Sequence, residues 1–399
     1  MKVLVVSHLY PSPASARMRF VHDQVRALRD AGVDIRVVSP TNYAPRIVWR
    51  LDPRLRRLGQ RPRNAVIDGV RVEYPRVALL PKRLLFEHSG ELVYAALWRH
   101  RAAWRAAHFD LVHAHQALPD GGAARHLSAT LGVPYVVTVH GVDVNVHLAT
   151  AGRVAETTAA VLNDAAAVVA VSTAVERRLA GVVAAQRLHV VGNGVEVGEP
   201  VAAAGLLPGR RLVLSVGHLI ETKGNGVVLD ALAQLTGAGR FPDLDYAIVG
   251  EGPLRDELQT RANELGLGAR VHFLGHLPQR EVLALMARAD VFALPSSPEG
   301  FGLVYSEAMA QGTPVIACRG EGPEDFIDDG LSGLLVAPRD PSALAAAIER
   351  LCDDADAARG IGEAGRRAVT ELTWQRTAVA LAQIYNDVVA RASRPRRAE

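Results

Sequence analysis

Lysine is scarce in this sequence of 399 residues, because only three of its 45 basic residues are lysines. Lys2 lies at the amino terminus, Lys82 lies beside Arg83 in a basic stretch, and Lys223 stands alone in a loop flanked by glycines. A pyridoxal-dependent phosphorylase needs a lysine that forms a Schiff base with its cofactor. Lys223, in a loop of the phosphate-binding type, is a poor candidate for that role.

Cysteines, aromatic residues and long apolar runs are also few. Two cysteines, Cys318 and Cys352, cannot form a disulfide framework and lack the spacing of metal ligands, which favours a reducing compartment such as the cytoplasm. No run of 18 apolar residues occurs, so we expect no membrane span. The apolar run at 3–6 is too short for a signal peptide and predicts a first buried strand. Aromatic residues make up 5% and no recognition motif appears, which argues against nucleic-acid binding.

Short apolar runs alternate with segments of helical periodicity, and apolar residues make up 49% of the chain. This alternation predicts parallel sheets built from βαβ units. In the first half we expect strands at 2–6, 35–38, 111–113, 135–138, 167–171 and 189–191. A helix is expected over 20–31, and a second one is expected to begin at Thr173 with the capping pattern Thr-Ala-Val-Glu.

A second series of strands follows a stretch without periodicity. Residues 196–210 are rich in glycine, proline and alanine and predict a linker between domains. Further strands are expected at 212–216, 245–249, 271–274, 291–294, 314–317 and 333–336, with a last helix at 377–390. The sequence therefore predicts an α/β protein with two Rossmann-like, doubly wound parallel-sheet domains, 1–195 and 211–375, facing each other across a cleft.

Glycine-containing loops follow each of the first five strands of the second half. They are residues 217–224, 250–253, 275–276, 299–302 and 320–324. Glycine lets a ligand approach the backbone closely and exposes N–H groups that suit phosphate. The ammonium of Lys223, in the first loop, suits a diphosphate. The alternative interpretation is that these glycines only close βα turns and that Lys223 is a surface charge.

Residues 289–314 carry the most information about function. An apolar run at 291–294 ends in Pro-Ser-Ser-Pro, which is followed by Glu299 and the glycine loop 300–302. Glu307 lies eight residues after Glu299, in an expected helix. A carboxylate at a strand end, a glycine loop and a helix N-terminus are the parts from which α/β folds build ligand sites. The other interpretation is that Glu299 and Glu307 are two solvated surface side chains without a shared function.

Taken together, these segments resemble the retaining glycosyltransferases of family 4. The resemblance rests on the loop Gly-His-Leu-Ile-Glu-Thr-Lys-Gly, the turn Gly-Glu-Gly-Pro, the pair Glu299 and Glu307, and the run Gly-Thr-Pro-Val-Ile-Ala at 312–317. It covers essentially the whole chain and is most specific over 212–340. It implies the GT-B fold, with the acceptor on the first domain and a nucleotide sugar on the second. It also implies that helix 377–390 crosses back to the first domain.

The resemblance implies a role for each matching residue of the second half. Lys223 is expected to contact the donor diphosphate, and Glu299 is expected to bind hydroxyls of the transferred sugar. Glu307 is expected to hold the ribose hydroxyls, since a carboxylate accepts two hydrogen bonds at once. The other expected donor-binding residues are Gly217, His218, Glu251, His276, Phe301, Gly302 and Leu303.

One position departs from the pattern of the family. His218 stands where arginine is usual, five residues before Lys223. A neutral imidazole has fewer donors than a guanidinium and no fixed charge. Either His218 is protonated beside the diphosphate, or another group such as Arg17 or Arg19 supplies the second cation.

In the first half, His140 follows an expected strand. With Lys223 and Glu299 it makes up the three catalytic candidates, because the matching histidine of the family faces the transferred sugar. The alternative is a core or capping histidine. Asp143 and Asn145, together with Arg17 and Arg19, are candidates for the acceptor side, although a helix cap is an equally good interpretation of the first two. His113 and His115 share a strand but have no third ligand nearby in the sequence, so we expect no metal site.

Basic residues are concentrated between residues 46 and 83, where eleven basic and three acidic residues occur. One interpretation is contact with an anionic membrane or with an anionic acceptor, which would make this a peripheral protein of the inner face of the cell membrane. The other interpretation is a solvated arginine-rich loop.

The resemblance implies transfer with retention and without a metal or other cofactor, since Lys223, backbone N–H groups and helix N-termini meet the diphosphate charge. No Asp-x-Asp motif occurs in the five loops, because the one at 243–245 opens a strand at the opposite edge. No residue makes a convincing covalent nucleophile. We therefore expect front-face transfer, in which the leaving phosphate helps to deprotonate the acceptor hydroxyl.

Other activities are alternatives to glycosyl transfer. A NAD-dependent dehydrogenase needs Gly-x-Gly-x-x-Gly after the first strand, where Ser-His-Leu-Tyr-Pro stands. A nucleotide-sugar 2-epimerase on the same fold, and a nucleotide-sugar-binding scaffold that lost turnover through the change at His218, stay open. A UDP-sugar is the commonest donor in the family. The acceptor is a lipid carrier, a polysaccharide end or a small natural product, and the sequence does not distinguish among these.

Overall fold

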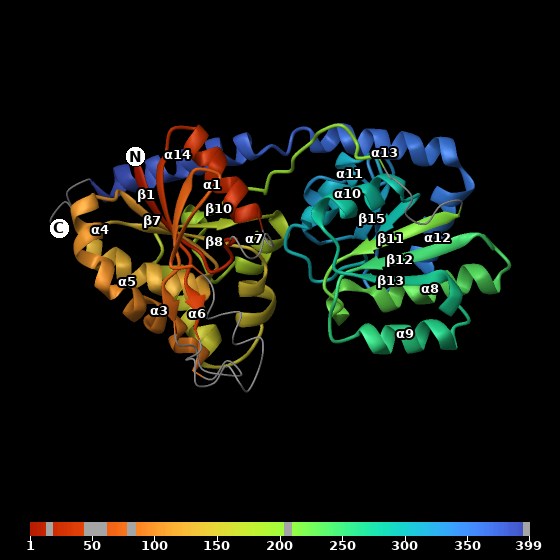
Figure 1. The fold of residues 1–399 in the computed structure, drawn as a ribbon, viewed down its shortest axis with the longest axis horizontal. Helices are drawn as coiled ribbons and strands as arrows, with labels where there is room; N and C mark the ends of the chain where they lie inside the picture. Colours follow the sequence, from red (N-terminus) through yellow and green to blue (C-terminus); the bar gives the residue numbers. More distant parts are fainter. Residues whose placement is uncertain (13–18, 44–61, 78–84, 203–209, 394–399) are drawn as a thin grey trace. The chain divides into compact units, whose positions relative to one another are not determined.

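Two compact units make up the chain in a computed structural model that describes residues 1–12, 19–43, 62–77, 85–202 and 210–393. Met1–Gly194 and Trp374–Glu399 form unit 1, and Val195–Thr373 form unit 2. Each unit has a central sheet with helices on both faces (Figure 1). The predicted linker at 196–210 falls at the start of unit 2, and its residues 203–209 lie outside the described ranges.

The sheet of unit 1 has the order β10-β9-β8-β7-β1-β2-β5-β4. Its central strands are buried along their whole length, which explains why they are continuous apolar runs in the sequence. The strands are β1 (Lys2–Val6), β2 (Asp34–Val38), β4 (Asn64–Ile67), β5 (Val70–Glu73), β7 (Leu111–His115), β8 (Tyr135–Val139), β9 (Ala167–Ala170) and β10 (Leu188–Val190). The six predicted strands are all present, with ends shifted by at most two residues.

The structure differs from the prediction at one edge of this sheet. Strands β4 and β5 form an antiparallel pair, so the sheet is not wholly parallel. The short strands β3 (Thr41–Asn42) and β6 (Arg76–Val77) form a separate parallel pair. The strands β3 and β6 have two residues each, so no apolar run marks them in the sequence. The rest of the basic segment 46–83 falls in residues 44–61 and 78–84, outside the described ranges.

Helices cover both faces of the sheet in unit 1. In Figure 1, α1 and α14 lie on one face, and α3, α5 and α6 lie on the other. The α-helices are α1 (Phe20–Asp30), α3 (Ser89–Leu97), α4 (Arg101–Ala107), α5 (Gly122–Leu131), α6 (Arg153–Asp164), α7 (Thr173–Leu179) and α14 (Trp374–Ala392). Single turns are η3 (Phe86–His88), η4 (Trp98–His100), η5 (Ala117–Gly121), η6 (Asp143–His147) and η7 (Ala185–Arg187).

The N-cap of α7 differs from the expected capping pattern. Ser172, with extended backbone at φ −160°, precedes the helix, and its side chain accepts a hydrogen bond from the N–H of Val175. Thr173 is instead the first helical residue. The pattern indicated the helix correctly, but the residue before it has the extended backbone that a cap needs.

The last helix, α14, packs against α1 and buries one side in the core of unit 1. Ala378, Leu381 and Tyr385 belong to the same apolar cluster as Val21 and Val25 of α1. A polar contact also joins this helix to the sheet, because the hydroxyl of Tyr385 lies 2.7 Å from Nδ1 of His113 on β7. Nε2 of His113 lies 2.8 Å from Oγ1 of Thr138 on β8. Both ring nitrogens of His113 are therefore satisfied inside the protein.

Unit 2 has a fully parallel sheet with the order β13-β12-β11-β14-β15-β16. The strands are β11 (Arg211–Val216), β12 (Leu244–Val249), β13 (Val271–Gly275), β14 (Val291–Ala293), β15 (Val315–Cys318) and β16 (Leu334–Val336), which confirms the six predicted strands within one residue at each end. The helices are α8 (Asn225–Gly237), α9 (Arg255–Glu264), α10 (Gln279–Arg288), α11 (Leu303–Ala310), α12 (Pro341–Asp353) and α13 (Ala355–Val369). Single turns are η8 (Glu221–Lys223), η9 (Gly268–Arg270) and η10 (Gly322–Asp325).

The sheet of unit 2 separates two apolar clusters. One includes Leu229 of α8 and Leu344 of α12, and the other includes Leu285 of α10 and Met309 of α11. Figure 1 shows α8, α9 and α12 on one face and α10, α11 and α13 on the other. Within the described residues of both units, no helix is both long and apolar enough to cross a bilayer.

The contact between Tyr385 and His113 gives a first prediction. The substitution Tyr385→Phe keeps the ring but removes the partner of a buried imidazole nitrogen, so we expect the free energy of unfolding to fall by about 1 to 3 kcal/mol. Tyr94→Phe is the matched control, because its hydroxyl bonds to Thr130 at a half-buried site where water can replace it. Urea unfolding of both variants measures the difference, and an equal loss in the two would contradict the prediction.

Candidate active site

Backbone hydrogen bonds join the loops at the carboxyl ends of β11, β12 and β13 in unit 2. The N–H of Gly217 donates to the carbonyl of Val249 at 2.9 Å, and the N–H of Gly250 donates to the carbonyl of Gly275 at 2.8 Å. Gly250 has φ +139°, and a Cβ there would lie 1.8 Å from the carbonyl oxygen of Gly217. Glycine is therefore required at position 250 by this close approach of two loops.

Similar bonds bring in the loops that follow β14 and β15. The N–H of Ser297 donates to the carbonyl of Thr222 at 2.8 Å, and that of Gly322 donates to the carbonyl of Glu299 at 3.3 Å. A Cβ on Gly322 would lie 2.2 Å from the carbonyl oxygen of Gly300. All five glycine loops predicted from the sequence thus form one rim at the carboxyl edge of the sheet.

Lys223 and Glu299 form an ion pair on this rim, although they are 76 residues apart in the sequence. Nζ of Lys223 lies 2.6 Å from Oε2 of Glu299, and the side chains are 22% and 13% exposed. The other carboxylate oxygen, Oε1, accepts a hydrogen bond from the N–H of Gly300 at 3.0 Å. The carbon chain of Lys223 lies beside Gly217, where an added Cβ would be 3.7 Å from its Cδ. Two of the predicted catalytic residues are therefore in direct contact.

Glu321 holds the backbone of Glu299 by a hydrogen bond, and sequence reasoning did not assign it a role. Its side chain is 6% exposed. Oε2 accepts from the N–H of Glu299, and Oε1 accepts from the hydroxyl of Ser297, both at 2.8 Å. The only signal in the sequence was an acidic residue between two glycines, which does not reveal what the carboxylate accepts. Glu321 fixes the backbone from which the Glu299 side chain projects.

The residues predicted after Glu299 lead into α11. Phe301 is 5% exposed and its ring packs on Phe326 with centroids 5.2 Å apart, so its side chain is structural and only its N–H is left for a ligand. Gly302 has a left-handed backbone, φ +85°, and precedes Leu303, the first residue of α11. The first N–H groups of a helix have no acceptor within it, so this end can bind an anion.

The other predicted donor-binding residues lie farther along the rim. Glu307 of α11 accepts a hydrogen bond from the amide of Gln279 on α10 at 2.9 Å. His218, Glu251 and His276 have exposed side chains in the loops after β11, β12 and β13. The carbonyl of Glu251 also accepts from the N–H of Leu219 at 3.0 Å, so part of its contribution is to hold two loops together.

In unit 1, His140 follows β8 and contacts a second histidine. Its Nε2 lies 2.9 Å from Nδ1 of His115, and the two rings are stacked with centroids 5.2 Å apart. Phe20 meets the His140 ring edge-on at 5.0 Å. Burial lowers the pKa of His140 to about 3, so the imidazole is neutral at physiological pH. His113 and His115 make hydrogen bonds to other side chains, and among the described residues no group of three or more His, Cys, Asp or Glu has the arrangement of a metal site.

The acceptor-side candidates have different surroundings. Asp143 is fully buried, its Oδ1 accepts from the N–H of Ala117 at 2.6 Å, and burial raises its pKa to about 6. It thus joins the loops after β7 and β8. Oδ1 of Asn145 is buried without a hydrogen-bond partner among the described residues. The guanidinium of Arg19 lies 3.0 Å from the carboxylate of Asp68, and Arg17 lies outside the described residues.

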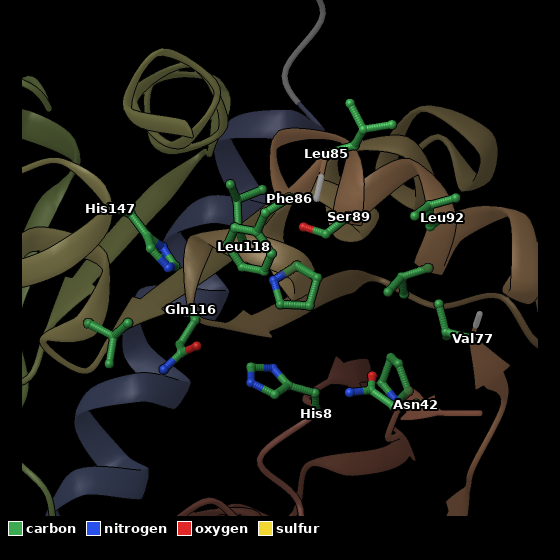
Figure 2. Close-up of a pocket in the computed structure, with 14 residues that line it drawn as sticks. His8, Asn42, Val77, Leu85, Phe86, Ser89, Leu92, Gln116, Leu118 and His147 are labelled. Atoms are coloured by element: carbon green, nitrogen blue, oxygen red, sulfur yellow. The ribbon is translucent and has the colours of Figure 1, made fainter. Parts of the chain in front are cut away.

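A pocket of about 350 Å³ opens in unit 1 (Figure 2). Sequence reasoning missed it, because its residues come from many separate segments. Nδ1 of His8 lies 2.8 Å from the buried carboxylate of Asp120, which orients the His8 ring. Oγ of Ser89 is buried without a hydrogen-bond partner in the described part of the chain. The lining has mainly apolar side chains with a few polar ones: His8, Pro40, Asn42, Val77, Leu85, Phe86, Ser89, Leu92, Val93, Gln116, Leu118, Pro119, Val142 and His147.

Comparisons with known proteins place the chain among characterised families. The family model "Glycosyl transferases group 1" matches residues 202–368, and the model "Glycosyl transferase 4-like domain" matches residues 18–194. The chain is 31% identical to the glycogen synthase of Mycobacterium tuberculosis, over 96% of this chain and 94% of that protein. It is also 31% identical to the GDP-mannose-dependent alpha-(1-6)-phosphatidylinositol monomannoside mannosyltransferase of Mycolicibacterium smegmatis, over 78% of this chain and 80% of that protein.

Among solved structures, HepE of Anabaena in complex with UDP and glucose has a TM-score of 0.75 to this structure. The two chains are 22% identical, and the alignment covers 97% of this chain and 100% of HepE. At this level of identity the similarity shows a shared fold.

The role of Glu321 gives a second prediction. Glu321→Ala leaves the N–H of Glu299 and the hydroxyl of Ser297 without their acceptor, so we expect a loss of about 1 to 3 kcal/mol in the free energy of unfolding. Glu321→Gln is the matched variant: its amide oxygen still accepts from the N–H of Glu299, and its NH₂ can donate to the hydroxyl of Ser297. Urea unfolding is therefore expected to rank wild type above Gln and Gln above Ala, and a Gln variant as unstable as Ala would contradict this role.

Proposed function

The chain belongs to the group 1 glycosyltransferase family and is a transferase with the GT-B fold, and from this premise we propose a more specific activity. It moves a hexose-type sugar from a nucleoside diphosphate sugar, most simply a UDP-sugar, to an acceptor hydroxyl. The anomeric configuration is retained and no metal ion takes part. The family resemblance predicted from the sequence is confirmed by the two family models, and the donor, the stereochemistry and the metal independence are the proposal.

The observation that carries the proposal is the ion pair of Lys223 and Glu299 on the loop rim of unit 2. Lys223 is partly exposed, so its ammonium is accessible to a diphosphate while Glu299 holds it in place. As the bond from the sugar to the phosphate breaks, negative charge grows on the leaving phosphate oxygen. A cation that is already oriented stabilises this charge without reorganising. This is why we assign the lysine a catalytic role.

The backbone supplies the rest of the proposed diphosphate site. The first N–H groups of α11 and the glycine loops at 217 and 250 lie on the same rim as Lys223. Such groups bind an anion as a set of fixed dipoles and replace a divalent cation in this role. Glu299 is then left to accept hydrogen bonds from the sugar hydroxyls, and Glu307 from the ribose, as the family resemblance implies.

The proposed chemical step is a front-face transfer. The bond between the anomeric carbon and the phosphate oxygen breaks, and the acceptor oxygen bonds to the same face of that carbon. The acceptor's proton passes to the departing phosphate, which thereby leaves as the nucleoside diphosphate. Neither Glu299 nor His140 forms a bond to the sugar in this scheme. Each positions it by hydrogen bonds.

We propose the pocket of unit 1 as the acceptor site. It lies among loops that follow β1, β2, β7 and β8, and the carboxyl ends of parallel strands are where open α/β sheets bind ligands. Its mixture of apolar side chains with a few polar groups is typical of a pocket for an organic molecule. A cell-envelope polysaccharide, a glycolipid or a natural product all fit this description.

The cellular location of the protein and the base of its donor nucleotide are also part of the proposal. Both cysteines are free and buried, as a protein of the reducing cytoplasm would keep them. The relative from Mycolicibacterium smegmatis is named for GDP-mannose, whereas HepE was solved with UDP and glucose, so either base is compatible with relatives of this chain. Docking of the segment 46–83 on an anionic membrane, and the protonation of His218 beside the diphosphate, stay proposals from the sequence.

A donor panel tests the activity as a whole. We expect release of UDP from UDP-glucose or another UDP-hexose, faster with an acceptor than without one, and unchanged by a chelator. Proton NMR of the product should show the anomeric configuration of the donor. Conversion of the pure donor to its 2-epimer would instead identify an epimerase. Donor binding without turnover would identify a scaffold, and loss of activity with the chelator would contradict metal independence.

Substitution of Lys223 tests the mechanism. Lys223→Met keeps most of the side-chain volume but removes the ammonium, so we expect kcat to fall about 100- to 1,000-fold, as it does when a donor to a developing charge is lost. Lys223→Arg keeps the charge and is expected to retain more activity. Glu221→Gln in the same turn η8 is the control for loop disturbance, because its side chain is exposed. A Met variant with unchanged kcat would refute the assigned role.

A further inference from the structure

His115 has two ring nitrogens in different situations. Nδ1 lies 2.9 Å from Nε2 of His140, whereas Nε2 is fully buried and has no hydrogen-bond partner among the described residues. The ring itself is 0% exposed and lies between two other imidazoles, with centroids 4.5 Å from His113 and 5.2 Å from His140. The hydrogen bond to His140 is therefore the only one that the His115 side chain makes among the described residues.

Only one of the two histidines can donate in the hydrogen bond that joins them. If His140 donates from Nε2, His115 accepts at Nδ1 and its own proton sits on Nε2, where a buried N–H would have no acceptor. If His115 donates from Nδ1, its Nε2 carries no proton and the unsatisfied group is an acceptor lone pair. Orphaned buried N–H groups are rarer in proteins than under-used acceptors. The second arrangement is therefore the more stable one.

We propose that His115 is a positioning residue that holds His140 in the tautomer with the proton on Nδ1. Nε2 of His140 then accepts from His115, and Nδ1 becomes a fixed N–H donor. In the described structure Nδ1 of His140 makes no hydrogen bond of its own. This inference rests on the proposed function, in which His140 faces the transferred sugar, since the N–H would then donate to a sugar hydroxyl.

The arrangement also limits what His140 can do in the reaction. Its one lone pair is used by the hydrogen bond from His115, so it has none left to take a proton from the acceptor. Burial and the nearby His8 lower the pKa of His140, and burial with the neighbouring histidines lowers that of His115, so both rings remain neutral. His140 therefore orients the sugar as a neutral donor, and the acceptor's proton goes to the leaving phosphate.

His113 does not share this role, although it is on the same strand and equally buried. Its two nitrogens contact Thr138 and Tyr385, at 2.8 and 2.7 Å. Tyr385→Phe therefore disturbs the neighbouring imidazole without touching the hydrogen bond between His115 and His140. It is the control for a general effect of loosening this part of the core.

The tautomer can be measured without any assay of activity. Protein labelled with ¹⁵N in its histidines gives ring-nitrogen shifts that separate protonated from bare nitrogens, and a His140→Gln variant assigns the His140 signals. We expect a protonated Nδ1 and a bare Nε2 for His140 in the wild-type protein. A proton on Nε2 would overturn the proposal, whether or not the protein transfers sugar, so this result is independent of the proposed function.

Activity gives the second test. Asparagine carries an N–H donor close to the position of imidazole Nδ1, so His115→Asn is expected to keep the His140 tautomer and most of kcat. His115→Leu removes the donor, and we expect kcat to fall about 10- to 100-fold with a smaller change in KM for the donor sugar, the size of effect seen when the outer partner of a functional histidine is lost. Tyr385→Phe is expected to retain kcat. A Leu variant that matches the wild type, or an Asn variant no better than Leu, would overturn the proposal.

Discussion

The close approach of the glycine loops at the carboxyl edge of the unit 2 sheet is the constraint on which its site depends. Gly250 and Gly322 lie so near a neighbouring carbonyl that no side chain fits there. The loops bond to each other through their backbones, and the buried side chain of Glu321 adds a further contact by accepting from the N–H of Glu299. The side chains of Lys223 and Glu299 can therefore be directed at a ligand, although one comes from the loop after β11 and the other from the loop after β14.

The carboxylates of Glu299 and Glu321 both lie on the rim that carries Lys223, and each is stabilised in a different way. Glu299 is neutralised by the ammonium of Lys223, whereas Glu321 is buried and accepts from a backbone N–H and a hydroxyl. The hydrogen bonds from the N–H of Glu299 and the hydroxyl of Ser297 stabilise the buried Glu321 carboxylate. Among the described residues the ammonium of Lys223 pairs with Glu299, which is itself 13% exposed, so in the proposed reaction a diphosphate can share the ammonium with this carboxylate.

The features that could be predicted from the sequence are those that depend on periodicity and on local chemistry. Buried parallel strands are continuous apolar runs, and the glycine loops mark their carboxyl ends, so the twelve predicted strands and the five loops were found. The short strands β3 and β6 were not, since two-residue elements carry no such pattern. Glu321 and the pocket of unit 1 were missed for a different reason. A carboxylate's partners and a pocket's lining come from distant segments, and neither leaves a local signal.

The surroundings of the histidines in unit 1 explain why Lys223, and not a histidine, supplies the positive charge in the proposed reaction. The ring of His115 is stacked on His140 and tilted against His113, with centroids 5.2 and 4.5 Å apart, and burial lowers the pKa of all three imidazoles. A proton on His115, the middle ring, would be deprived of water and would lie against two imidazoles, neither of which carries a negative charge. Burial therefore favours the neutral form of the three rings, and the hydrogen bond between His115 and His140 is satisfied by a choice of tautomer. In the proposed tautomer, the hydrogen bond that orients His140 also uses its one lone pair, so the role proposed for this residue is that of an N–H donor and not of a base.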